Sequence, residues 1–274
     1  MKKYTLFRYP MASGFSPIIH QAFAKQFNIE IEYTQTEVSP GTLSKAIQTF
    51  HAQGGQGANV TMPLKEEAYS LCNQMSARAT IAGSVNTLFW KNSELWGDNT
   101  DGDGLVRDII QNKRLQLKDK TLCILGAGGA ARGILGPLLL QKPKKIILAN
   151  RTQERAENVR ERFLASSVPI EVIPFLSLEE IASHTSLDWI FKAVPAIEFA
   201  PSVVQNSLVY DLAYSRGEHP VTAFMQWALD HGATQAFDGL GMLVEQAAMS
   251  FSIWNDGKFP DTTSVIELCR EISL

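Results

Sequence analysis

The chain has 274 residues, of which 45% are hydrophobic and 19% are charged, and its formal net charge is −3 at pH 7. This length allows one large or two ordinary domains, and the hydrophobic content is ample for packed cores, which excludes a disordered chain. The negative charge argues against a nucleic-acid or anionic-membrane surface, so we expect a small-molecule partner.

The cysteines and histidines predict neither disulfides nor a metal site. The three cysteines are odd in number and lie far apart among apolar residues, as in reduced proteins. No two histidines are four residues apart, and none is near a cysteine. The N-terminus lacks the apolar stretch of a signal peptide, and no apolar run is long enough to span a membrane. We therefore expect a cytoplasmic monomer or homodimer without bound metal.

Strand and helix signals alternate along the first part of the chain, which predicts an α/β fold with parallel sheets. Runs typical of strands lie near Tyr4–Tyr9, Ile29–Gln35 and Ala58–Met62. Runs typical of helices lie near Pro17–Phe27, Gly41–Gln53 and Pro63–Gln74. Two further apolar runs, Ser84–Trp90 and Glu94–Gly97, predict a hairpin.

A second series of strands and helices begins at Thr121 with a glycine turn. The apolar run Thr121–Leu125 leads directly into Gly126, Ala127, Gly128, Gly129 and Ala130, and then into a helical segment. This spacing fits G-x-G-x-x-G/A, in which glycine lets the backbone approach a pyrophosphate and the helix N-terminus offers free N–H groups. The pattern predicts a dinucleotide site.

The next strand indicates which dinucleotide binds. In an NAD site the second strand ends in an acidic residue that binds the ribose 2′-hydroxyl. Here the run Lys145–Ala149 is followed by Asn150, Arg151 and Thr152, with Arg155 one helical turn later. Guanidinium groups match phosphate geometry, so these residues predict a 2′-phosphate and hence NADP(H).

The remaining signals complete a two-domain organisation. Further strands are predicted near Ile170–Pro174, Trp189–Val194 and Leu208–Leu212, and a helix over Gly241–Asp256 is followed by another that runs to Leu274. We expect residues 103–238 to form a Rossmann-type NADP-binding domain. Residues 1–102 and 239–274 would form a substrate-binding and catalytic domain, because the last helices do not continue the nucleotide pattern. A substrate cleft is expected between the two.

Four polar clusters lie at strand ends or helix starts outside the nucleotide unit, where doubly wound folds hold ligands: Ser13–Pro17, Gly57–Lys65, Ser84–Thr87 and Gly97–Gly102. With these clusters the chain resembles the shikimate dehydrogenase family nearly end to end. The matching motifs are N-V-T-x-P-x-K at 59–65, V-N-T at 85–87, G-D-N-T-D-G at 97–102, G-A-G-G-A at 126–130, N-R-T-x-x-R at 150–155, Y-D at 210–211 and D-G-x-G-M-L-V-x-Q at 238–246. The resemblance implies reversible NADPH-dependent reduction of 3-dehydroshikimate to shikimate in aromatic amino acid biosynthesis.

The expected chemistry needs a proton acceptor beside the carbinol carbon while a hydride leaves it. Lys65 is the candidate, because with Pro63 at the first helical position it falls in the first helical turn. There the helix dipole disfavours a cation by about 0.3–1 kcal/mol, which favours the neutral amine that a general base needs. The resemblance implies that Asp101 orients both the lysine and the substrate hydroxyl.

The resemblance also assigns the binding residues. Asn59, Thr61, Asn86 and Gln246 would bind the substrate, together with Ser16 at its carboxylate, while Leu212 and Gly239 would border the cofactor. Closed polar clefts need such short hydrogen-bonding groups, because each unpaired polar group costs about 1–3 kcal/mol. Ser16 also precedes Pro17 and is a good candidate for a helix N-cap, a role that is compatible with substrate binding.

Two departures from the family pattern leave alternatives open. Gly14 replaces the first of two serines that would hold the carboxylate, so Ser13 would compensate or a relative such as quinate would be preferred. Lys192-Ala193-Val194 replaces N-A-T beside the cofactor, and Lys192 would either approach a cofactor phosphate or point to solvent. The alternatives are a quinate-type dehydrogenase and a noncatalytic NADP(H)-binding sensor, although the retained Lys65 and Asp101 argue against the sensor.

Overall fold

The computed structural model describes residues 1–195, 199–215 and 221–272 and divides into two compact units. The first unit is Met1–Gly104 with Leu243–Cys269, and the second is Leu105–Met242 with the residues from Arg270 onward. Within the described residues each unit contains a six-stranded sheet.

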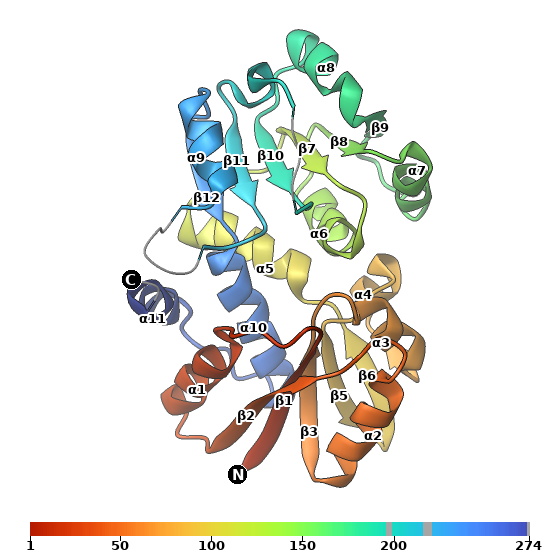
Figure 1. The fold of residues 1–274 in the computed structure, drawn as a ribbon, viewed down its shortest axis with the longest axis vertical. Helices are drawn as coiled ribbons and strands as arrows, with labels where there is room; N and C mark the ends of the chain where they lie inside the picture. Colours follow the sequence, from red (N-terminus) through yellow and green to blue (C-terminus); the bar gives the residue numbers. More distant parts are fainter. Residues whose placement is uncertain (196–198, 216–220, 273–274) are drawn as a thin grey trace. The chain divides into compact units, whose positions relative to one another are not determined.

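The sheet of the first unit has the order β2-β1-β3-β5-β6-β4. Its strands are β1 (Lys2–Arg8), β2 (Ile31–Glu37), β3 (Gly55–Val60), β4 (Gln74–Met75), β5 (Thr87–Lys91) and β6 (Glu94–Asp98). Figure 1 labels the strands β2, β1, β3, β5 and β6. β1 is parallel to β2 and β3, whereas β5 is antiparallel to β3 and β6, so this sheet is mixed and not parallel throughout. The predicted hairpin is confirmed: Asn92 and Ser93 have positive φ values of 53° and 65°, which suit a tight turn between twisted strands.

Helices cover both faces of this sheet (Figure 1). They are α1 (Ser16–Gln26), α2 (Leu43–Ala52), α3 (Lys65–Leu71) and α4 (Ala77–Ala82), with parts of α5 (Asp101–Arg107), α10 (Leu240–Trp254) and α11 (Thr263–Ile272). Alternation along β1 serves the two faces: Tyr4 packs with Trp254 of α10, while Phe7 packs in the cluster that contains residues of α2 and α3. Both faces of β1 are therefore buried.

The sheet of the second unit is parallel, with the order β12-β11-β10-β7-β8-β9. Its strands are β7 (Thr121–Leu125), β8 (Lys145–Asn150), β9 (Ile170–Pro174), β10 (Trp189–Lys192), β11 (Leu208–Asp211) and β12 (Gln235–Asp238). Its other elements are η1 (Asp108–Asn112), α6 (Gly129–Leu140), α7 (Gln153–Glu161), η2 (Phe175–Ser177), α8 (Leu178–His184), η3 (Pro201–Val204) and α9 (Ala223–Asp230). This is the strand order of doubly wound dinucleotide-binding domains, in which the order reverses between β7 and β10.

The two apolar clusters of the second unit explain its layers. Ile124 on β7 packs with the cluster that includes residues of α6 and α7, whereas its neighbour Leu125 packs with the cluster that includes residues of α8 and α9. Strands that are buried on both faces read as continuous apolar runs, as Thr121–Leu125 does.

Several local predictions need correction. Phe15 is the N-cap of α1 and Ser16 is the first helical residue, so the predicted capping role of Ser16 is wrong. Leu64 donates its N–H to the carbonyl of Thr61 and closes a turn, so α3 begins at Lys65 and not at Pro63. The predicted end of the last helix, Leu274, lies outside the described residues.

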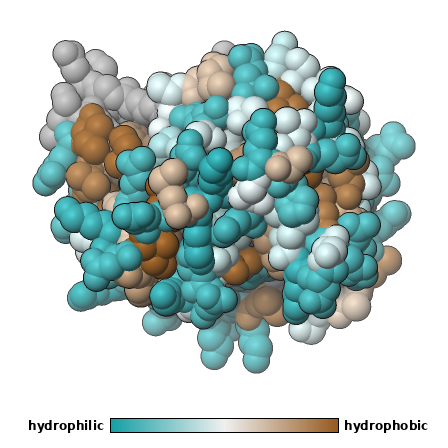
Figure 2. All heavy atoms as spheres, turned by 90° about the horizontal axis from the view of Figure 1, so that it is seen from below, coloured by the Kyte–Doolittle hydropathy of each residue, from teal (hydrophilic) through white to brown (hydrophobic). Residues whose placement is uncertain are grey.

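The face of the molecule that Figure 2 shows is mainly hydrophilic, and the hydrophobic residues on this face lie in separate patches. Within the described residues, none of the helices combines the length and the apolar character that a membrane crossing requires.

Candidate active site

A close ion pair joins the starts of two helices in the first unit. Lys65, the first residue of α3, places its Nζ 2.6 Å from Oδ2 of Asp101, the first residue of α5. The two side chains are 19% and 8% exposed, so water screens the pair only partly. Charge-assisted hydrogen bonds of this length are stronger than neutral ones. Asp101 therefore fixes the position of the Lys65 amine, and both side chains remain partly accessible to solvent.

The ion pair changes the electrostatic argument for Lys65. The helix dipole alone disfavours the ammonium form, by about 0.3–1 kcal/mol. The adjacent Asp101 carboxylate attracts the Lys65 side chain, because the two opposite charges lie within 4 Å of each other. Lys65 thus lies in direct contact with the carboxylate of Asp101, the residue that the resemblance expects to orient it.

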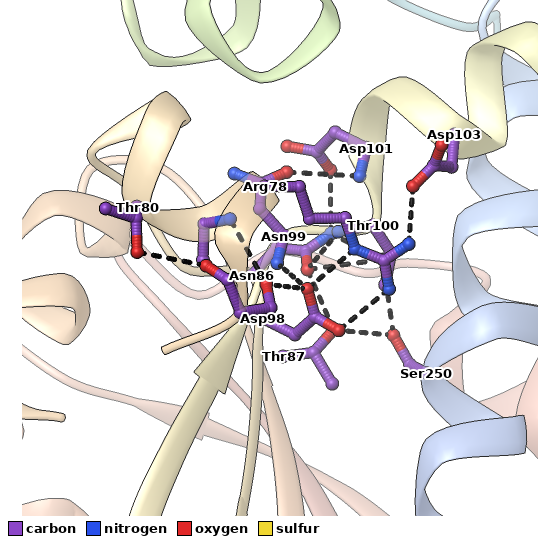
Figure 3. Close-up of polar contacts among 12 residues, drawn as sticks. Arg78, Thr80, Asn86, Thr87, Asp98, Asn99, Thr100, Asp101, Asp103 and Ser250 are labelled. Atoms are coloured by element: carbon purple, nitrogen blue, oxygen red, sulfur yellow. Dashed lines mark hydrogen bonds and ion pairs between the residues drawn. The ribbon is translucent and has the colours of Figure 1, made fainter. Parts of the chain in front are cut away.

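Asn86 connects this pair to the rest of the site. Its Nδ2 donates to Oδ1 of Asp101 at 2.8 Å, and Oε1 of Gln246 lies 3.1 Å away (Figure 3 shows Asn86 and Asp101). Its Oδ1 accepts the backbone N–H of Thr100 at 3.0 Å. The structure therefore brings together Lys65, Asp101, Asn86 and Gln246, four of the predicted site residues.

Asn59 lies next to Asn86 and is only 7% exposed. Both its amide nitrogen and its amide oxygen form hydrogen bonds with other protein groups. Its Nδ2 donates to Ser250 Oγ at 3.0 Å and to the carbonyl of Asn86 at 3.2 Å. Its Oδ1 accepts the hydroxyl of Tyr33 at 2.7 Å and lies 3.1 Å from Nε2 of His20. An amide has two hydrogens and two lone pairs, so these contacts favour a supporting role for Asn59.

The two ring partners of Asn59 are buried and uncharged. Burial lowers the pKa of His20 to about 3, partly opposed by its hydrogen bond with Asn59. Burial also raises the pKa of Tyr33 well above its ordinary value, partly opposed by a hydrogen bond with Ser16. The rings of His20 and Tyr33 stack with their centroids 4.4 Å apart. His20, Tyr33 and Asn59 therefore form an uncharged, hydrogen-bonded cluster next to Asn86.

Ser16 and Thr61 complete the predicted substrate residues. Both are partly exposed, and Thr61 lies just beyond the end of β3. Within the described residues, the Thr61 hydroxyl has no hydrogen-bond partner. It is free to bind a ligand.

Three hydroxyl residues of this network were not singled out from the sequence. Thr87, Thr100 and Ser250 are all fully buried, and Ser250 lies 2.7 Å from Thr87 and 3.5 Å from Thr100 between their Oγ atoms. Ser250 and Gln246 are four residues apart on α10 and share one helix face, which was the available signal for Ser250.

The glycine turn of the second unit is open as a dinucleotide site requires. Gly126 has φ +115°, and a Cβ on it would lie 2.7 Å from Cγ1 of Val194. Gly128 is the N-cap of α6 without a side-chain cap, and a Cβ there would meet nothing within 4 Å. Open space above an uncapped helix N-terminus fits a pyrophosphate, so the residues present fit NADP(H).

The turn after β8 presents the predicted arginines. Asn150 ends β8 and donates its side-chain N–H to the carbonyl of Thr152 at 2.8 Å, which shapes the turn. Arg151 and Arg155 are both exposed, and within the described part of the chain neither guanidinium has an ion pair or hydrogen bond. Both guanidinium groups follow β8, the strand that pairs with β7 next to the glycine turn, and they are available to bind a phosphate.

Gly239 and Leu212 lie together at the ends of β12 and β11. A Cβ on Gly239 would collide with the carbonyl oxygen of Leu212, and the Gly239 N–H donates to the carbonyl of Ala213 at 2.9 Å. Gly239 therefore lets the backbone that carries Leu212 pack closely.

Lys192 takes neither of the two orientations that the sequence suggested. It is 6% exposed, and its Nζ lies 3.0 Å from Oδ1 of Asp211 and 5.4 Å from the ring centre of Phe224. Asp211 also accepts the hydroxyl of Thr222 at 2.8 Å and the N–H of Ala213 at 3.1 Å. The lysine thus joins the ends of β10 and β11 from inside the unit.

Comparisons with known proteins agree along the chain. Residues 6–88 match the family described as shikimate dehydrogenase substrate binding domain, residues 108–223 match shikimate / quinate 5-dehydrogenase, and residues 239–269 match the shikimate 5′-dehydrogenase C-terminal domain. The shikimate dehydrogenase (NADP(+)) of Colwellia psychrerythraea is 40% identical over 98% of this chain and 96% of the relative. That of Alcanivorax borkumensis is 41% identical over 97% and 96%. The crystal structure of an Ael1 enzyme from Pseudomonas putida has a TM-score of 0.89 and 33% identity over 98% of each chain.

Proposed function

Because this chain belongs to the shikimate dehydrogenase family, we propose that it catalyses the reversible reduction of 3-dehydroshikimate to shikimate with NADPH. The observation that carries the assignment of its catalytic residues is the 2.6 Å pair between Lys65 Nζ and Asp101 Oδ2. Bound NADPH supplies the hydride.

In the direction of reduction, the ammonium group of Lys65 donates a proton to the carbonyl oxygen of the substrate as that oxygen gains negative charge. The carboxylate of Asp101 holds the ammonium in place and stabilises its charge before the transfer. In the reverse direction the neutral amine accepts the proton of the hydroxyl. The same pair therefore serves as general acid and general base.

The neighbouring polar groups bind the substrate ring. We assign the hydroxyl of Thr61 and the exposed part of Gln246 to substrate hydroxyls, and Ser16 to the carboxylate. Asn86 orients Asp101 through its 2.8 Å hydrogen bond, and Asn59 supports Asn86. On the second unit, the turn at Gly126–Ala130 binds the pyrophosphate and Arg151 and Arg155 bind the 2′-phosphate.

Gly14 makes quinate a specific second candidate. A glycine in place of a serine removes one hydroxyl donor from the carboxylate site and leaves room for an added substituent. The preference between shikimate and quinate is therefore part of the test.

The direct test measures the formation of NADPH or NADH by the purified protein with shikimate or quinate, each with NADP⁺ or NAD⁺. We expect turnover of shikimate with NADP⁺, and a much smaller kcat/KM with NAD⁺. A larger kcat/KM for quinate would transfer the assignment to a quinate dehydrogenase. NADP⁺ binding without turnover in any combination would favour the noncatalytic sensor.

A further inference from the structure

Arg78, which is not among the proposed substrate-binding residues, forms hydrogen bonds to the turn that carries Asp101. Figure 3 shows the guanidinium of Arg78, on α4, bonded to Asp98 and to Asp103. Its Nε and Nη2 donate to the two oxygens of Asp98, both at 2.7 Å, and its Nη1 donates to Asp103. Asp98 ends β6 and Asp103 lies in the first turn of α5, so the fork holds the chain on both sides of Asp101.

The carboxylate of Asp98 accepts further hydrogen bonds in this arrangement. Besides Arg78, its Oδ1 accepts the hydroxyl of Ser76 and the backbone N–H of Asn99. The backbone carbonyl of Asp98 accepts the N–H of Asn86 at 3.0 Å. Fixing Asp98 thus also fixes the strand end that carries Asn86, the partner of the other Asp101 oxygen.

The charges explain why an arginine is needed here. Asp98, Asp101 and Asp103 put three carboxylates into one short turn, and the Asp98 side chain is only 10% exposed. A partly buried carboxylate without a partner is costly. Arg78 pairs with two of the three carboxylates and offsets one of their two negative charges, which leaves Asp101 as the carboxylate that pairs with Lys65.

We propose that Arg78 is a positioning residue for the reaction: its fork on Asp98 and Asp103 fixes the turn so that Asp101 holds Lys65 in the geometry for proton transfer. This inference rests on the proposed function. Helix α4 has its own caps, since Ser76 Oγ accepts the N–H of Ala79 at 3.2 Å and Gly83 ends the helix with φ 59°. The arginine fork is therefore not what forms the helix.

The test compares Arg78→Gln and Arg78→Lys with the wild type. Small displacements of catalytic groups cost up to roughly a hundredfold in rate, so we expect Arg78→Gln to lower kcat by about ten- to a hundredfold with a much smaller change in KM for shikimate. Arg78→Lys keeps the charge without the fork, and we expect an intermediate kcat. Lys45→Gln, which removes an exposed charge from α2, is the matched control and should have wild-type kcat.

A second variant, Asp103→Asn, keeps the proposal testable if Arg78→Gln does not fold, because it leaves the buried Asp98 carboxylate paired with Arg78. Asp103→Asn weakens only the contact to α5, leaves the two bonds to Asp98, and should lower kcat by a smaller factor at nearly wild-type thermal stability. If Arg78→Gln and Asp103→Asn both keep wild-type kcat, whatever their stability, the proposal is wrong.

A crystal structure of Arg78→Gln provides a readout that does not depend on turnover. We expect Asp101 to move out of its 2.6 Å contact with Lys65 Nζ. An unchanged contact overturns the positioning role. If the wild-type protein fails to oxidise shikimate, the proposed function fails, and this distance still decides whether Arg78 positions Asp101.

Discussion

At the scale of single residues, the proposed proton transfer depends on the contact between Lys65 and Asp101. The contact between Lys65 and Asp101 is close and largely shielded from water, and it joins the two residues that the resemblance named as a pair. The carboxylate of Asp101 attracts Lys65 strongly at this distance, because partly buried charges interact more strongly than exposed ones. Lys65 is therefore poised to donate in the direction of reduction.

Replacing Lys65 tests this role. We expect Lys65→Ala to lower kcat by about 10²- to 10⁴-fold, because the general acid and base is removed. Its circular dichroism and its affinity for NADPH should stay close to those of the wild type, since Lys65 lies in the other unit from Arg151. Wild-type turnover by a correctly folded Lys65→Ala protein would show that another group moves the proton.

His20 gives a pH-dependent stability at the same scale. Its pKa is lowered from 6.5 to about 3 by burial, so the unfolded chain binds the proton more tightly than the folded one. The contribution of His20 to the free energy of unfolding is therefore fully present above pH 6.5, and it is lost as the pH drops toward 3. Between pH 7 and pH 5 the loss through this residue is about 2 kcal/mol.

Urea unfolding at several pH values measures this loss. His20→Gln, which cannot bind the proton, should lose about 2 kcal/mol less than the wild type between pH 7 and pH 5. His184→Gln, at an exposed position on α8, should keep the wild-type slope. Equal slopes in the wild type and His20→Gln would mean that His20 is not held neutral in the folded protein.

At the scale of elements, β10 and β11 are tied together at their ends by the buried pair of Lys192 and Asp211. Removing one member leaves an uncompensated charge, which costs about 3–5 kcal/mol for a buried pair. We expect Lys192→Met to lower the free energy of unfolding by up to this amount, measured in urea as a lower midpoint at an unchanged m value.

The double variant Lys192→Met/Asp211→Asn provides the control. It removes the unpaired carboxylate while keeping an acceptor for Thr222, so it should recover most of the loss. A single Lys192→Met variant as stable as the wild type would show that water reaches and compensates Asp211.

Elements whose signals are local were predicted well, and those set by distant partners were not. The glycine turn before α6 and the hairpin of β5 and β6 depend on residues within each segment. The short elements β4 and α4 fall where the sequence predicted the end of a longer helix or no element. Their positions are set by pairing with β6 and by the contact from Arg78 to Asp98, which local patterns do not encode.

At the scale of the whole molecule, the proposed substrate and cofactor residues belong to different compact units. A ligand at about a hundred times its Kd stabilises a protein by about 2.7 kcal/mol. For a chain of this size that corresponds to a rise in Tm of roughly 5–10 °C. We expect shikimate and NADP⁺ each to raise the Tm.

Matched variants assign each shift to its unit. Arg151→Ser should reduce the shift by NADP⁺ and keep the shift by shikimate. Thr61→Ala should do the reverse, because the hydroxyl assigned to the substrate is lost. If Arg151→Ser leaves the NADP⁺ shift unchanged, the 2′-phosphate does not bind at the end of β8.

The sequence by itself determined the α/β class, the dinucleotide turn, the arginines after β8 and the family resemblance, because each depends on residues close together in the chain. Only the tertiary structure decided that β5 pairs antiparallel with β3, that the side chain of Asn59 has hydrogen bonds to protein groups on all sides, and that Lys192 pairs with Asp211. Those outcomes depend on which side chains meet after folding. Burial then makes an unpaired charge or polar group costly, and it selects the partner that the linear sequence leaves open.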